Sequence, residues 1–129
     1  MTEPRIESKW IDAFRRVLEM CAVRAGDAVA ILSETQSRGV NVQLAELAAL
    51  GLGARAFHVV VPTPRQTAPV PIRSTGASDA IQGLVPVIQA LGTAALVIDC
   101  TVEGLLHAKE LGAILQAGAR VLMVSNEHP

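Results

Sequence analysis

Apolar residues follow two patterns along the chain, one typical of amphipathic helices and one typical of buried strands. Between Ile6 and Cys21 they recur every three or four positions with charged residues between them, which predicts a first helix. The run at 28–32 is continuously apolar and bounded by polar residues, which predicts a strand that is buried on both faces. Residues 33–39 are polar and are predicted to form a loop.

The same alternation continues to the end of the chain. Helical spacing at 40–51 is followed by glycines and by a β-rich run at 55–61. A third helical pattern ends at Leu91, and its Pro86 predicts a kink or a late start. The remaining elements are a strand, a helix and a strand, predicted at 94–99, 109–117 and 120–124.

Two local features surround the third helix. Asp79 and Gln82 have the spacing of a capping box, which predicts the beginning of this helix. Before them, residues 62–78 contain four prolines and several serines and threonines, a composition that can continue neither a helix nor a strand. A loop of this length in a compact domain is usually a functional flap or a mobile segment.

Strands that alternate with helices predict βαβ crossovers and therefore parallel pairing. The predicted fold class is α/β, with three layers: a mostly parallel four-stranded sheet with helices on both faces, as in Rossmann or flavodoxin-like folds. The length of 129 residues fits a single domain at 1–129. The sequence ends directly after the last predicted strand, so we expect a further domain or subunit to cover the exposed apolar surface.

Composition excludes several classes of partner. The net charge is −1 and aromatic residues make up 2% of the chain, so we expect no binding of nucleic acid. No signal peptide and no apolar stretch of about 18 residues occurs, which predicts a cytoplasmic protein that does not contact a membrane. Cys21 and Cys100 lack the spacing of a metal site and are interpreted as reduced packing thiols.

Short motifs give little evidence for a bound cofactor or metal. Residues 51–56 match the letters of a dinucleotide fingerprint, but they follow a helix and precede a strand, so we interpret them as a helix stop. The histidines His58, His107 and His128 do not have metal-ligand spacing. We therefore predict no cofactor-binding residue and no metal ligand in this chain.

His107 is the candidate catalytic residue because of its place between a predicted strand end and the helix at 109–117. Ligands of open α/β sheets bind at the carboxyl ends of the strands. The positive end of a helix dipole would favour a neutral imidazole that can accept a proton. The alternative is a solvent-facing loop histidine. Other polar residues at this edge are interpreted as helix caps or loop-stabilising groups: Ser33, Glu34, Thr35, Ser37, Cys100 and Thr101.

Three consecutive segments resemble a known family over nearly all of the chain. They are the strand Leu96-Val97-Ile98-Asp99, the step Leu105-Leu106-His107 and the helix and strand at 113–122. Together they resemble the N-terminal domain of 2,5-dihydroxypyridine 5,6-dioxygenase. Enzymes of that family are iron(II)-dependent ring-cleaving dioxygenases of nicotinate degradation, in the same fold family as the aminopeptidase T type of leucyl metallo-aminopeptidases.

The resemblance implies that two domains contribute different residues to one active site. In the family, histidines and a carboxylate from a C-terminal domain bind the metal, so Fe(II) is expected outside this chain, in a domain that begins beyond Pro129. The histidine of the Leu-Leu-His step transfers a proton, and His107 matches it. The implied partners are that metal-binding domain, a small aromatic substrate and further copies in a homo-oligomer.

Two alternatives to a dioxygenase domain remain open at this point. The chain could be the N-terminal domain of a leucyl metallo-aminopeptidase, which would be recognised by peptide hydrolysis without oxygen uptake. It could also be a free-standing α/β binding module without catalysis. Because the family's metal ligands cannot be placed on this sequence, we expect the 129 residues alone to be inactive.

Overall fold

The computed structural model describes residues 6–64 and 76–125, and in this part of the chain helices and strands alternate. The elements are α1 (Ser8–Met20), β1 (Ala28–Glu34), α2 (Gly39–Gly51), β2 (Arg55–Val61), α3 (Val85–Gly92), β3 (Leu96–Asp99), α4 (Leu111–Gln116) and β4 (Arg120–Met123).

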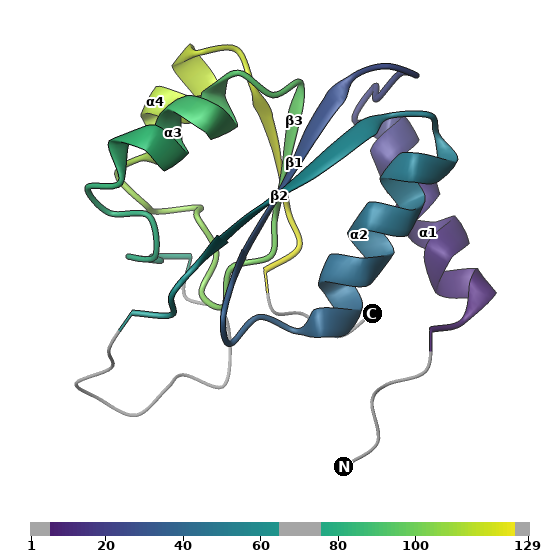
Figure 1. Cartoon of the computed structure of the whole chain (residues 1–129), viewed down its shortest axis with the longest axis horizontal. Helices are drawn as coiled ribbons and strands as arrows, with labels where there is room; N and C mark the ends of the chain where they lie inside the picture. Colours follow the sequence, from purple (N-terminus) through teal and green to yellow (C-terminus); the bar gives the residue numbers. More distant parts are fainter. Residues whose placement is uncertain (1–5, 65–75, 126–129) are drawn as a thin grey trace.

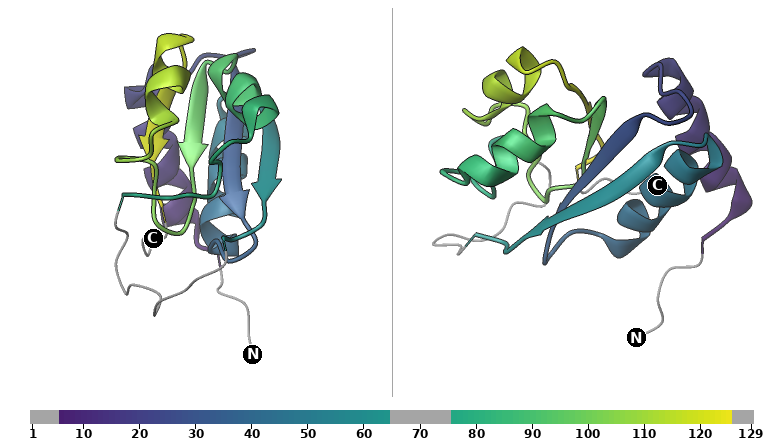
Figure 2. Two further views of the ribbon diagram at one scale, coloured as in Figure 1. Left: turned by 90° about the vertical axis from the view of Figure 1, so that its left-hand side faces the viewer. Right: turned by 45° about the horizontal axis from the view of Figure 1, so that its top comes forward.

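The strands form one parallel sheet in the order β2-β1-β3-β4. Helices α1 and α2 cover one face of this sheet, and α3 and α4 cover the other (Figure 1). The same three layers are visible after rotation (Figure 2). The predicted three-layer α/β fold with helices on both faces is confirmed, and each described strand pair is parallel.

The two central strands separate two apolar clusters, one under each helix layer. On the side of α1 and α2, Ile31 and Ile98 pack with the fully buried Leu18. On the side of α3 and α4, Leu32 and Val97 pack in the second cluster. The prediction of a strand buried on both faces is therefore confirmed for the run at 28–32, apart from the exposed Ala28 at its start.

The structure corrects the end of the first predicted strand and confirms a late start of the third helix. Strand β1 continues to Glu34, because Ser33 and Glu34 pair with Val60 and Val61 of β2, so the predicted loop at 33–39 is shorter. Helix α3 starts late and has its proline in the first turn, as Pro86 predicted.

The capping box predicted from Asp79 and Gln82 is wrong. The residue that precedes α3 is Leu84, which makes no side-chain cap, and the Gln82 N–H donates to the Asp79 carbonyl at 3.1 Å within a turn.

Most of the predicted loop at 62–78 lies outside the described residues.

Within the described ranges, none of the helices is both long and apolar enough to cross a bilayer.

Candidate functional site

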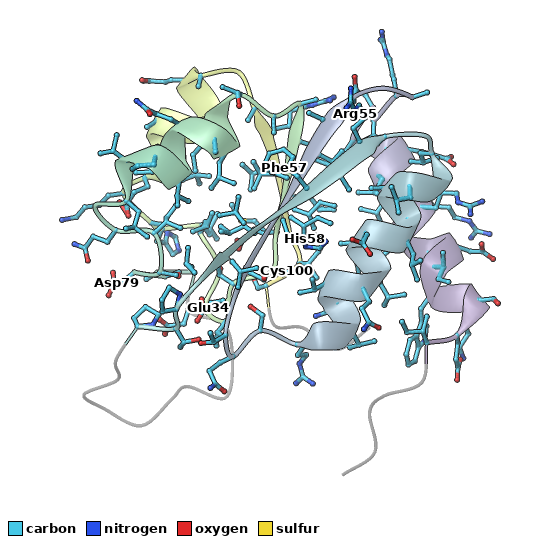
Figure 3. The ribbon with its side chains drawn as sticks, viewed as in Figure 1. Glu34, Arg55, Phe57, His58, Asp79 and Cys100 are labelled. Atoms are coloured by element: carbon cyan, nitrogen blue, oxygen red, sulfur yellow. The ribbon has the colours of Figure 1, made fainter. Side chains whose placement is uncertain are left out.

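The carboxyl ends of β1 and β3 meet in the middle of the sheet, where the chain turns outward in both directions. From β1 it continues to the edge strand β2, and from β3 to the edge strand β4. Ligands of open α/β sheets bind at such a switch point. Glu34 at the end of β1 marks this edge, and Arg55 at the start of β2 marks the opposite one (Figure 3).

Asp99 shapes the loop that follows β3. Its carboxylate is fully buried. Oδ1 accepts hydrogen bonds from the Thr101 N–H at 3.0 Å and from the Thr101 hydroxyl at 2.6 Å. Oδ2 accepts a bond from the Leu105 N–H at 2.8 Å. Burial raises the pKa of the Asp99 carboxyl, and these hydrogen bonds oppose that rise.

Glu34 connects the loops that follow β1 and β3. Its side chain is only 5% exposed, and its Oε2 accepts a hydrogen bond from the Val102 N–H at 3.2 Å. Burial raises the pKa of the Glu34 carboxyl, and the neighbouring carboxylates of Asp99 and Glu103 raise it further, while the Val102 N–H lowers it. The buried side chain of Glu34 therefore joins the two loops from inside the molecule.

Hydroxyl groups make further connections between the loops at this edge. The Ser37 hydroxyl donates to the Cys100 carbonyl at 2.6 Å and accepts a bond from the Glu34 N–H at 2.9 Å. The Thr35 and Thr63 hydroxyls bond to each other at 3.0 Å and join the loops after β1 and β2. The interpretation of these residues as loop-stabilising groups is confirmed, whereas the N-cap residue of α2, Arg38, makes no side-chain cap.

Cys100 is a packing residue of the core. It is fully buried, and burial raises the pKa of its thiol to about 12. A thiol with such a pKa stays protonated at neutral pH and is a poor nucleophile. Both Cys21 and Cys100 are free, which agrees with their interpretation as reduced thiols.

His107 lies between β3 and α4, as predicted, and its side chain is exposed. Its backbone N–H donates to the Gly76 carbonyl. The residue lines a small polar pocket of about 150 Å³, whose other lining residues are Ala77, Ser78, Asp79, Gln82, Ala108, Lys109 and Glu110. The imidazole is thus accessible to a small polar molecule in this pocket.

The helix-dipole argument for His107 is wrong. The sequence predicts a helix from residue 109, two residues after His107, whereas α4 begins at Leu111 with Glu110 as its N-cap, so His107 lies a full turn before the helix. The influence of a helix dipole falls off within one turn. The accessibility of His107 therefore comes from the loop and not from α4.

The other residues singled out by the sequence lie away from this edge. His58 on β2 bonds through Nε2 to Glu46 Oε1 of α2 at 2.7 Å (Figure 3). Residues 51–53 end α2, with Gly53 in the left-handed conformation, which confirms the helix stop. His128 lies outside the described residues.

Among residues 6–64 and 76–125, no group of three or more His, Cys, Asp or Glu side chains could hold a metal ion. The described side chains therefore do not fit an iron site.

Asp99 and Gly76 were missed as parts of the site. An acidic residue at the end of an apolar run is a usable signal for Asp99, since a charge there must be paired or hydrogen-bonded. Gly76 gave no local signal, because its contact with His107 joins two separate loops.

Comparisons with known proteins find one family whose model matches most of the chain. The family model of 2,5-dihydroxypyridine 5,6-dioxygenase matches residues 9–129. The solved structure of a 2,5-dihydroxypyridine dioxygenase from Pseudomonas putida KT2440 has a TM-score of 0.81 and 28% identity. That similarity covers 95% of this chain and 35% of the dioxygenase, so the chain spans about a third of that protein's length.

A second solved structure supports the fold alone. Klebsiella oxytoca NpsA in complex with 3-hydroxyanthranilyl-AMSN has a TM-score of 0.51 and 16% identity, over 91% of this chain and 18% of that one. A comparison with curated proteins gives no match.

Proposed function

The chain belongs to the 2,5-dihydroxypyridine 5,6-dioxygenase family, and we propose that it forms the N-terminal domain of a dioxygenase that cleaves the ring of a dihydroxypyridine-type aromatic. The observation that carries this proposal is the family match over residues 9–129. The similarity to a solved dioxygenase over 95% of the chain supports it.

In this proposal His107 is the proton-transfer residue. A hydroxyl group of a dihydroxypyridine loses a proton when its ring is activated for attack by dioxygen. The exposed imidazole of His107 can accept that proton on a ring nitrogen and return it to the product. Its place on a polar pocket beside the carboxyl ends of the strands supports this role.

The rest of the assembly belongs to the same proposal. Fe(II) would be bound outside this chain, by a C-terminal metal-binding domain, as the resemblance to the family implies. Residues 1–129 would then be one domain of a two-domain, cytoplasmic, homo-oligomeric enzyme. The relation to leucyl metallo-aminopeptidases remains a prediction of the sequence.

The test is oxygen uptake by the full-length protein loaded with Fe(II) and supplied with 2,5-dihydroxypyridine. We expect the wild type to cleave the ring. The kcat of His107→Ala should be lower by a factor of about 100 or more, since general acid–base groups contribute roughly 10²–10⁴-fold to the rate.

His58→Ala is the matched control, because it removes another accessible imidazole. His58 lies on the face of the sheet that α1 and α2 cover, opposite to α3 and α4 (Figure 1). The pair of His58 with Glu46 is partly exposed and contributes little to stability, so the kcat of His58→Ala should equal that of the wild type. An undiminished rate in iron-loaded His107→Ala would remove His107 from the mechanism. Peptide hydrolysis without oxygen uptake would instead identify the aminopeptidase branch.

A further inference from the structure

We propose that Gly76 is a positioning residue for His107: the absence of a side chain at residue 76 creates the space in which the imidazole lies. This inference rests on the proton-transfer role proposed for His107. It concerns the orientation of the ring, which the family resemblance does not address.

Backbone hydrogen bonds hold residues 76–78 against the loop that carries His107. The Gly76 N–H donates to the Glu103 carbonyl at 2.6 Å, and the Ser78 N–H donates to the Gly104 carbonyl at 2.9 Å. The His107 N–H donates back to the Gly76 carbonyl. Backbone hydrogen bonds therefore hold Gly76 next to His107.

The imidazole occupies the volume that a side chain at residue 76 would need. A Cβ on Gly76 would lie 3.0 Å from His107 Cδ2 and 3.1 Å from Leu106 Cβ. Carbon atoms are normally separated by about 3.5–4.0 Å. Gly76 is also in the left-handed conformation, with φ of 77°. Both the close contacts and the left-handed conformation therefore favour glycine at residue 76.

The loop backbone cannot move away from an added methyl group as easily as the ring can. Leu105 is fully buried, and its N–H is bonded to the buried carboxylate of Asp99 at 2.8 Å. The side chain of His107, by contrast, is exposed and can rotate toward solvent. A methyl group at residue 76 would press on both the His107 ring and Leu106 Cβ. Because the exposed ring is the group that can rotate, it should shift while the fold stays in place.

The test is a double-mutant cycle in the full-length, iron-loaded protein: wild type, Gly76→Ala, His107→Ala and the double variant. Misplacing a reacting group by about 1 Å costs up to about 10²-fold in rate. We expect Gly76→Ala alone to lower kcat about tenfold with KM unchanged, and to lower it less than about twofold when His107 is already alanine.

Gly26→Ala is the matched control. Gly26 also has a left-handed φ, of 86°, but nothing lies within 4 Å of the position of a Cβ there. The two single variants should lower the melting temperature by similar amounts, while Gly26→Ala leaves kcat unchanged.

The outcomes separate this inference from the proposed function. If Gly76→Ala keeps the wild-type kcat while His107→Ala loses activity, the positioning role is wrong and the proton-transfer role stands. The inference would also be overturned if the losses in kcat of Gly76→Ala and His107→Ala simply multiplied in the double variant. A melting temperature of Gly76→Ala far below that of Gly26→Ala would overturn it too, because the methyl group would then act on the fold. An active His107→Ala would overturn the proposed function and this inference together.

Discussion

At the scale of single residues, two buried carboxylates organise the edge of the sheet. Asp99 receives three hydrogen bonds from the loop that follows it, and Glu34 receives one from the Val102 N–H. An ionised group is costly to bury unless such donors stabilise it. Charge-assisted hydrogen bonds therefore fix the loop as far as Leu105, and His107 lies two residues beyond it.

Glu34→Gln should change how the stability of the protein depends on pH. A carboxyl whose pKa is raised on folding holds its proton in the folded state while the unfolded chain has lost it, so the free energy of unfolding falls as pH rises through that window. Glutamine keeps an oxygen that accepts from the Val102 N–H, but it does not ionise. We therefore expect Glu34→Gln to gain stability relative to the wild type as pH rises from about 4 to 7.

The measurement is urea unfolding of both proteins, followed by circular dichroism, across that pH range. Glu19→Gln on the exposed surface of α1 is the control for the removal of one negative charge. A difference between Glu34→Gln and the wild type that is the same at every pH would show that burial does not affect the ionisation of Glu34.

At the scale of elements, the packing of α3 on α4 depends on Gly92. A Cβ at this residue would lie 2.8 Å from the Cβ of Ala117, the residue after α4. Gly92→Ala should therefore lower the free energy of unfolding by about 1–3 kcal/mol through overpacking. The second change Ala117→Gly removes the methyl group on the other side.

Four proteins measured by urea unfolding complete this test: the wild type, the two single variants and the double variant. We expect Gly92→Ala to cost less in the Ala117→Gly background than in the wild type, because the clash is absent there. Equal costs in both backgrounds would mean that the two helices do not meet at this contact.

The elements themselves were largely predictable from the sequence, because local patterns determine them. The continuous apolar run at 28–32 predicts a central strand, and Pro86 predicts the late start of α3. The end of β1 was not predictable, since Ser33 and Glu34 are polar yet buried by pairing with β2. The start of α4 at Leu111 was missed because residues 109 and 110 form a turn whose sequence is compatible with a helix.

At the scale of the whole molecule, the order of the elements predicted the place of the site but not its contacts. His107 could be assigned to the carboxyl edge because it follows β3 in a parallel sheet. Its surroundings depend on contacts between distant residues, such as those of Glu34 with Val102 and of Gly76 with His107. These contacts join segments that are far apart in the sequence and form only in the folded chain, so local sequence patterns do not encode them.

The most direct test of the central claim is an experimental structure of the full-length, iron-loaded protein with 2,5-dihydroxypyridine bound in the absence of oxygen. We expect a ring nitrogen of His107 within about 2.6–3.2 Å of a substrate oxygen, or joined to it through one water molecule. A substrate bound elsewhere, with the His107 ring turned toward solvent and no bridging water, would contradict the account.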